Sequence, residues 1–263
     1  MIEGRVLTRW SLGTFTFVVY ALVYLPIGLV VLTSFNQATI TTLPIEHFDT
    51  HWYKELFEDT KTLQSLWTSL QVAVISTAIA TTLGLLSALA IVRHNFRGKS
   101  VFLLLTIMPM LAPGIIMGVS LLLFARFVGF QTGFVAVLFG HILLAMPYCT
   151  FILVSSLARF DRSLEEAARG LGAGEMSVLW LVTLPAIVPG IIGAALFAFT
   201  ISIGEFVVSF FLTSAGTTTL PIRIYSIVKV GITPEINAVS TLILVATLLL
   251  SAVALSLTWS RRK

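Results

Sequence analysis

Uncharged, strongly apolar runs recur along almost the whole of this chain. They reach or exceed the length of about 20 residues that an α-helix needs to cross the hydrocarbon core of a bilayer. The 263 residues are 57% hydrophobic and 11% charged, whereas roughly a quarter of the residues of a soluble domain are charged. The sequence therefore predicts an all-α membrane protein in which residues 1–263 form a single transmembrane domain. The six expected spans are residues 12–33, 66–92, 101–125, 134–158, 186–212 and 238–259.

Charged residues between these runs set the expected orientation. Eleven of the sixteen Lys and Arg residues fall on the side that holds both termini, and basic residues favour the cytoplasmic side of a membrane. We therefore expect cytoplasmic termini, external segments at residues 35–65 and 213–237, and an internal charged stretch at residues 159–175. Because topology and anionic lipid account for the basic excess, no nucleic-acid partner is expected.

Residues that a transmembrane helix tolerates poorly stand inside the predicted spans. Prolines and glycines are dense from Pro109 to Gly118, and such breaks occur where neighbouring helices or a cavity satisfy the freed backbone groups. Kinked helix packing and a break that lines a translocation path both remain open here. We expect Cys149 to be a packing residue and His141 to hydrogen-bond between helices rather than to relay protons.

The cytoplasmic stretch 159–175 contains the pattern of a short amphipathic helix. Ser163 is followed three residues later by Glu166, which is the capping-box spacing at a helix start. Apolar or small side chains then recur on one side, with charged ones between them, and glycines end the run. A plain connector and a surface for a cytoplasmic partner are equally open from these residues alone. The apolar side is Leu164, Ala167, Ala168 and Leu171, and the glycines are Gly170, Gly172 and Gly174.

The same stretch also carries the spacing of a known motif. A Glu-Ala-Ala triplet, a glycine four positions after its last residue and an apolar-x-Leu-Pro end resemble the EAA motif of ATP-binding-cassette (ABC) importer permeases. The resemblance implies a type I ABC importer permease fold, in which about residues 163–175 form a coupling helix seated on an ATP-binding subunit. The residues it assigns to ATPase coupling are Glu166, Ala167, Ala168, Gly172, Leu184 and Pro185.

Longer stretches resemble one group of these importers, the PotC-type permeases of spermidine/putrescine transport. They are residues 51–53, 96–99 and 220–238. The resemblance implies a multi-pass protein of a bacterial inner membrane that carries polyamines from periplasm to cytoplasm by alternating access. It also implies a second homologous permease, two ATP-binding subunits and a periplasmic substrate-binding protein. Gly114 and Gly204 stand where PotC-type permeases have aspartates, so another small cargo (an amino-acid derivative, an opine, a phosphonate) stays open.

The sequence offers no nucleotide site or enzyme site of its own. Gly98-Lys99-Ser100 imitates the end of a P-loop, but Arg93 occupies the position where that motif needs its first glycine. We expect no cofactor or metal in this chain, with ATP and Mg²⁺ bound by the partner ATPase. The G-x-S-x match at residues 118–121 is short enough to arise by chance, so an intramembrane enzyme is disfavoured. An ion-gradient secondary transporter would place more ionisable groups near the middle of the membrane, so this class is also disfavoured.

Four residues are candidates for the substrate pathway. Glu205 lies deep within a predicted span, where an ionisable group is costly and therefore suggests function. It either offsets the desolvation of a cargo ammonium group or makes an interhelical hydrogen bond or gate contact. Trp52 resembles an aromatic residue of the family's outer mouth, and it either stacks on cargo or anchors at the lipid interface. Tyr53 follows it. Asn237, at the outer end of the last span, either closes a gate or caps a helix.

Overall fold

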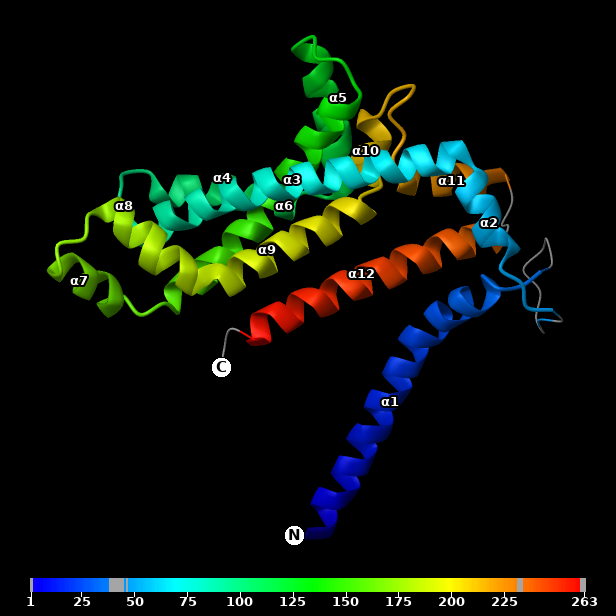
Figure 1. Ribbon diagram of the computed structural model, residues 1–263, viewed down its shortest axis with the longest axis horizontal. Helices are drawn as coiled ribbons and strands as arrows, with labels where there is room; N and C mark the ends of the chain where they lie inside the picture. Colours follow the sequence, from blue (N-terminus) through cyan, green and yellow to red (C-terminus); the bar gives the residue numbers. More distant parts are fainter. Residues whose placement is uncertain (1, 38–44, 46, 231–233, 261–263) are drawn as a thin grey trace. The chain divides into compact units, whose positions relative to one another are not determined.

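The structure, a computed structural model, describes residues 2–37, 45, 47–230 and 234–260. Helices make up nearly all of this part of the chain, where the one β-type contact is a bridge between Asn36 and Phe48. Backbone contacts divide the chain into two compact units, Met1–Leu63 with Ile224–Ala246 and Gln64–Arg223 with Thr247–Lys263. The elements (Figure 1) are α1 (Ile2–Thr33), α2 (His51–Glu58), α3 (Thr60–Arg93), α4 (Lys99–Leu111), α5 (Gly114–Phe127), α6 (Phe134–Ala158), α7 (Ser163–Gly170), α8 (Glu175–Val178), the π-helix η1 (Leu179–Thr183), α9 (Leu184–Gly204), α10 (Val207–Leu212), α11 (Leu220–Val230) and α12 (Pro234–Ser260).

Four helical stretches among the described residues are long and apolar enough to cross a bilayer. They coincide with, or contain most of, four of the six predicted spans. In α12, which carries the last predicted span, the described apolar stretch is the shorter Glu235–Leu249. The four stretches are Leu12–Thr33, Thr60–Arg93, Phe134–Ala158 and Glu175–Gly204.

The predicted span 101–125 is broken within the Pro109–Gly118 segment, where the sequence suggested a break. α4 ends at Leu111, α5 begins at Gly114, and the two helices meet at an angle of 110°. Ala112 between them is extended, with φ −76° and ψ 132°, as expected for a residue that precedes a proline. Pro113 has no N–H with which to continue the helix. The pair makes a fifth crossing if the bend belongs to one span.

The predicted span 186–212 is broken as well. Its helix begins earlier, at Glu175, and runs through α8, η1 and α9 before it ends at Gly204. Glu205 then adopts an extended backbone, with φ −73° and ψ 111°, and the short helix α10 resumes at Val207. The acid that was expected within a continuous span therefore stands at a helix break.

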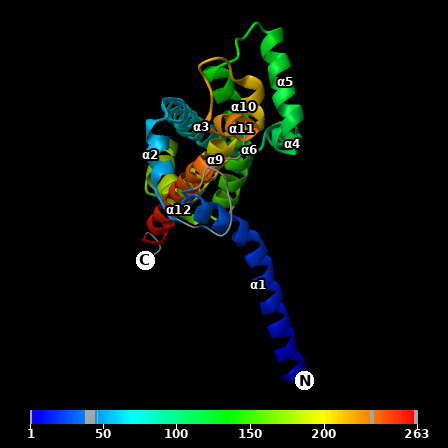
Figure 2. The ribbon, with the colours of Figure 1, turned by 90° about the vertical axis from the view of Figure 1, so that its right-hand side faces the viewer.

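Glycines of α5 and α6 allow close helix packing against α10. A Cβ atom at Gly118 of α5 would lie 2.5 Å from the Phe211 ring of α10, and one at Gly140 of α6 would lie 2.5 Å from Val208. Because these positions lack a side chain, α5 and α6 both close tightly on α10, as Figure 2 shows. These contacts support the packing interpretation of the break.

α6 is the centre of the larger unit, where it contacts α4, α5, α9 and α10. Small residues bring its neighbours close: a Cβ atom at Gly84 of α3 would lie 2.6 Å from Cβ of Cys149 and 3.0 Å from the backbone nitrogen of Thr150. Cys149 is fully buried in a cluster with Ala145 and Leu153. The packing role predicted for this cysteine is confirmed.

A buried polar chain ties four helices together near the break at Glu205. The Nδ1 atom of His141 lies 2.7 Å from the Ser202 hydroxyl of α9, and its Nε2 atom lies 2.8 Å from the Ser209 hydroxyl of α10. Ser76 of α3 donates to Ser202 over 3.0 Å. The prediction that His141 hydrogen-bonds between helices is confirmed, and both ring nitrogens are engaged across the break.

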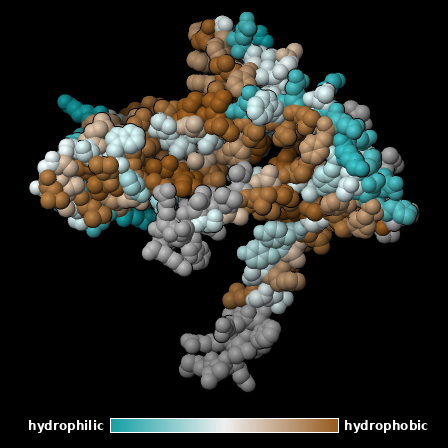
Figure 3. Space-filling model, viewed as in Figure 1, coloured by the Kyte–Doolittle hydropathy of each residue, from teal (hydrophilic) through white to brown (hydrophobic). Residues whose placement is uncertain are grey.

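The face of the molecule seen in Figure 3 is apolar over most of the long helices, and hydrophilic residues gather around α2. Large apolar side chains of the larger unit stand exposed, for example Leu104 at 61% and Leu181 at 77%. None of the most apolar window of α1 is buried within the chain. Surfaces of this extent need lipid or protein partners to cover them.

Gly84 offers a direct test of the α3–α6 contact. We expect Gly84→Val to lower the thermal midpoint of the detergent-purified protein, because overpacking against Cys149 costs about 1–3 kcal/mol. Gly193→Val in α9 is the matched control, since no atom lies within 4 Å of a Cβ built there. Equal midpoints for the two variants would contradict the close approach of α3 and α6.

Candidate functional site

The cytoplasmic helix expected at residues 163–175 forms as α7, which covers Ser163–Gly170. Its start is not the predicted capping box, because no side-chain bond of that kind caps the helix. Instead, the backbone N–H of Ser163 donates to Oδ1 of Asp161 over 2.9 Å. The hydrogen bonds from Ser163 lower the pKa of the Asp161 carboxyl, so the cap persists as a carboxylate at neutral pH.

The glycines end α7 as predicted. The N–H of Leu171 donates to the carbonyl of Ala167, and the N–H of Ala173 donates to that of Ala168, each over 3.0 Å. Gly172 between them has φ +89°, a left-handed conformation that residues with a Cβ adopt only at a cost. Gly172 is therefore required by the turn that leads the chain from α7 into α8.

The apolar side of α7 faces away from the rest of the described chain. Leu164 is 52% exposed and Leu171 is 90% exposed, and Ala167 is exposed as well. The helix is held by its charged side instead, since Glu165 is only 5% exposed. A helix that lies with its acid inward and its leucines outward leaves an apolar surface for something else to cover.

Glu165 anchors α7 to two other elements. Its Oε1 atom accepts a hydrogen bond from Nη2 of Arg93, the last residue of α3, over 2.5 Å. The same oxygen accepts the hydroxyl of Thr183, the last residue of η1, over 2.6 Å. Arg169 lies 4.0 Å from the other oxygen. The three-element contact was not foreseen, because the sequence pattern that singled out Glu166 gives no signal for its neighbour.

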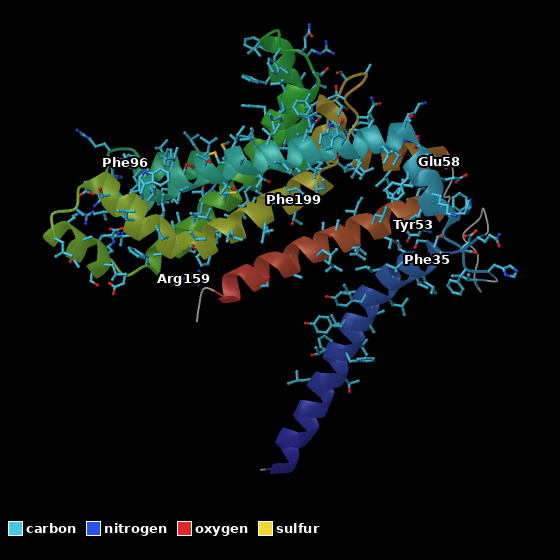
Figure 4. The ribbon with its side chains drawn as sticks, in the orientation of Figure 1. Phe35, Tyr53, Glu58, Phe96, Arg159 and Phe199 are labelled. Carbon is cyan, nitrogen blue, oxygen red and sulfur yellow. The ribbon has the colours of Figure 1, made fainter. Side chains whose placement is uncertain are left out.

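Further contacts hold the same end of the larger unit together. Arg162 donates to the carbonyl of Val92 over 2.8 Å, and the guanidinium of Arg93 lies 5.6 Å from the centre of the Phe160 ring. A cavity of about 570 Å³ opens between α3, α7, α8 and η1. Figure 4 shows Phe96 and Arg159 at this end of the unit.

Glu166, the acid of the EAA triplet, is placed differently from Glu165. It is exposed, and its carboxylate makes no hydrogen bond or ion pair with the residues that the structure describes. Leu184 and Pro185, at the other end of the motif, form the first turn of α9, where a proline is tolerated. The motif therefore spans from an exposed surface on α7 to residues inside the apolar stretch Glu175–Gly204.

Glu205, the first candidate for the substrate pathway, is engaged locally. Its Oε1 atom accepts the backbone N–H of Val208 over 2.9 Å, so the carboxylate caps α10 at the break. The side chain is neither fully buried nor fully exposed. This contact corresponds to neither of the two expected roles, since it lies within one broken helix rather than between helices or on a cargo.

The three other candidates belong to the smaller unit. Trp52 is 7% exposed, and its Nε1 donates to the carbonyl of Asn36 over 2.7 Å, so in this chain the ring is a packing residue. The hydroxyl of Tyr53 lies 2.7 Å from that of Ser34, and its ring lies beside Phe35 (Figure 4), with ring centres 5.3 Å apart.

Asn237 is not the N-cap of α12, which was one of its two expected roles. α12 already begins at Pro234, so Asn237 lies inside its first turn. The side-chain nitrogen of Asn237 donates to the hydroxyl of Thr33 over 3.0 Å. It therefore joins the start of α12 to the end of α1 within the smaller unit.

Comparisons with known proteins identify the family. Residues 80–262 match the binding-protein-dependent transport system inner membrane component family. The spermidine/putrescine transport system permease protein PotC of Haemophilus influenzae is 38% identical over 238 residues, which are 90% of this chain and 92% of that protein. The chain belongs to this permease family. The putrescine transport system permease protein PotI of Escherichia coli is 36% identical over 232 residues, 86% of this chain and 82% of that protein.

Solved structures of ABC transporters share the fold of this family member. A bacterial transporter involved in the import of the acidic polysaccharide alginate matches with a TM-score of 0.69 and 18% identity, over 97% of this chain and 96% of that one. The MetNI methionine ABC transporter in an inward-facing conformation matches with a TM-score of 0.63 and 20% identity, over 75% of this chain and 94% of that one. The chain is thus a multi-pass membrane permease with an importer-type helical fold.

The turn after α7 is open to test at Gly172. We expect Gly172→Ala to loosen the α7–α8 connection by about 1–2 kcal/mol, because the new Cβ clashes with the backbone at positive φ. Faster hydrogen exchange of residues 163–178 would report the loosening. Gly170→Ala is the matched control, because Gly170 lies within α7 and has open space around it; similar exchange in both variants would refute the strained turn.

Proposed function

We propose that this chain is the permease subunit of an ATP-driven importer that carries polyamines such as spermidine and putrescine from periplasm to cytoplasm. One observation carries the coupling part of this proposal. α7 is held by its buried Glu165, and this leaves Glu166, Leu164 and Leu171 of the EAA segment exposed. An exposed acid beside apolar side chains suits a partner surface with a basic residue and an apolar cleft.

The proposed assembly contains a second homologous permease, two ATP-binding subunits and a periplasmic substrate-binding protein. ATP and Mg²⁺ bind to the ATP-binding subunits, and this chain performs no covalent chemistry. We place six spans in a bacterial inner membrane with both termini in the cytoplasm, α4 with α5 and α12 supplying the fifth and sixth. The unburied apolar surface of α1 supports a chain that is completed by lipid and by a partner permease.

The proposed cycle is alternating access. Closure of the ATPase pair on ATP pushes α7, and the spans rock from inward-facing to outward-facing. Cargo then enters from the binding protein, and ATP hydrolysis resets the inward-facing state and releases the cargo to the cytoplasm. This chain transmits movement and forms part of the path.

Polyamine cargo is supported by the similarity to the spermidine/putrescine permease PotC and the putrescine permease PotI and by Glu205, a carboxylate within the proposed transmembrane region. One oxygen of Glu205 is used by the cap of α10, and the negative charge remains to offset an ammonium group. Another small cargo remains the alternative, because Gly114 and Gly204 stand where the PotC pattern has acids.

Coupling is tested by reconstituting the chain with its permease partner, ATPase and binding protein. We expect Glu166→Arg to reduce ATP-dependent uptake of labelled spermidine and putrescine by at least about tenfold, since reversing a charge in an interface costs about 2–5 kcal/mol. Glu58→Arg, an equally exposed acid on the opposite side in the proposed topology, serves as the control. Uptake without ATP, or an unmutated chain that does not associate with the ATPase, would show that the importer proposal is wrong.

The pathway role of Glu205 is tested with Glu205→Gln. The glutamine oxygen still accepts the N–H of Val208, so the α10 cap survives while the charge is lost. We expect polyamine uptake to fall by about tenfold, the scale of a lost charge-assisted hydrogen bond, with assembly of the complex unchanged. Unaltered uptake would remove Glu205 from the pathway.

A further inference from the structure

The buried carboxylate of Glu165 is the point where α7, α3 and η1 meet. One oxygen accepts both Nη2 of Arg93 and the hydroxyl of Thr183. The side chain of Glu165 is 6% exposed and that of Arg93 is 14% exposed. An ionised pair shielded from water in this way is stable only while both partners stay in place, because either charge alone is left desolvated.

The partners of Glu165 belong to two membrane-spanning stretches, Thr60–Arg93 and Glu175–Gly204. Arg93 is the last residue of α3, and Thr183 directly precedes α9. Both α3 and α9 belong to stretches long enough to cross a bilayer. A displacement of α7 therefore acts on two spans at once through a single carboxylate.

The other contacts of α7 are weaker attachments. Arg169 pairs with Glu175 over 2.7 Å, but the side chain of Glu175 is 78% exposed, and exposed pairs contribute little. Arg162 reaches the carbonyl of Val92 from an exposed position. Glu166 makes no hydrogen bond or ion pair with the described residues. Of the acids on α7, Glu165 alone is buried.

We propose that Glu165 is the positioning residue that transmits the movement of α7 to the membrane helices, by way of Arg93 and Thr183. The proposal rests on the proposed function, in which the ATPase acts on α7. It divides the two adjacent acids by role: Glu166 faces the ATPase, and Glu165 faces the spans. Loss of Glu165 therefore separates ATP hydrolysis from transport, whereas loss of Glu166 separates the subunits.

Glu165→Gln and Thr183→Val test this division in the reconstituted importer. The first keeps the shape of the side chain and removes its charge, and the second removes one hydroxyl at nearly constant volume. We expect the ATPase to co-purify with both variants and to hydrolyse ATP, while the amount of cargo moved per ATP falls by about tenfold for Glu165→Gln, within the usual range of coupling energies. For Thr183→Val, the amount of cargo moved per ATP should fall less, because the ion pair between Glu165 and Arg93 remains.

Asp161→Asn is the matched control. It removes an exposed negative charge from the same loop, and asparagine still accepts the N–H of Ser163 as a cap. We expect its cargo-to-ATP ratio to stay within about twofold of the unmutated chain, the range expected for a surface substitution. A loss equal to that of Glu165→Gln would attribute the effect to loop charge and overturn the proposal.

A distance measurement keeps the proposal testable if Glu165→Gln accumulates poorly. Spin labels at Asn95→Cys and Ser163→Cys report the separation of α7 from the end of α3, and the fully buried Cys149 stays unlabelled. We expect the same separation with and without ATP in the parent chain, and a shift of about 1–5 Å, the range of helix movements at interfaces, in Arg93→Gln, which breaks the link between Glu165 and the end of α3. A separation that changes in the parent, or stays fixed in the variant, would overturn it.

The outcomes also separate the two proposals. If Glu165→Gln loses the ATPase subunit, Glu165 is a docking residue; the transmission role fails and the importer proposal stands. If Glu165→Gln keeps full uptake per ATP, the transmission role fails in the same way. If the unmutated chain neither associates with an ATPase nor takes up cargo with ATP, the importer proposal itself fails.

Discussion

Lipid cannot hydrogen-bond a broken helix, and this constraint governs how the chain is built. Each break inside its apolar stretches needs protein groups to satisfy the backbone. At the first break, a proline without an N–H stands at the start of α5, and the N–H of Met117 returns to the carbonyl of Pro113 over 3.0 Å. At the second, the carboxylate of Glu205 takes the N–H of Val208. The helices that follow the breaks, α5 and α10, can form within the bundle because nearby protein groups accept the hydrogen bonds of their first backbone N–H groups.

The two breaks converge on α10. Gly118 of α5 and Gly140 of α6 admit its side chains, and His141 holds it to α9 across the gap. α10 is thereby packed firmly at the breaks, by apolar contacts at Gly118 and Gly140 and by hydrogen bonds among His141, Ser202 and Ser209. We call this arrangement the α10 joint. The α10 joint lies in the same unit as α7 and is connected to it through α9, which runs from Leu184 to Gly204.

Hydropathy and motif spacing were enough to predict the helical membrane fold, the bounds of most long helices and the position of α7. They pointed to the break between Pro109 and Gly118 but not to the one at Glu205, which has no proline. Nor does a proline suffice for a break, because Pro26, Pro147 and Pro189 lie inside unbroken helices. The decisive factor at each site is tertiary packing. The sidedness of α7 also escaped prediction, since the partners of Glu165 stand 72 and 18 residues away in sequence. Trp52 illustrates the same limit: its type suggested an exposed ring, and only the carbonyl of Asn36 explains its burial.

The π-helix η1 affects the direction in which side chains of the EAA motif region point, because the number of residues in a helix sets the rotation between its two ends. A π-turn holds one residue more than an α-turn, and each residue of an α-helix advances the side-chain direction by about 100°. Through this extra residue, η1 sets the rotational phase between α8 and α9 so that the hydroxyl of Thr183 faces Glu165. A chain one residue shorter at Leu179–Thr183 would keep its helices and its apolar pattern, yet would turn that hydroxyl about a quarter of the way around the axis. The number of residues between Gly172 and Leu184 thus determines the direction of the Thr183 side chain as well as the distance between the two ends of the motif.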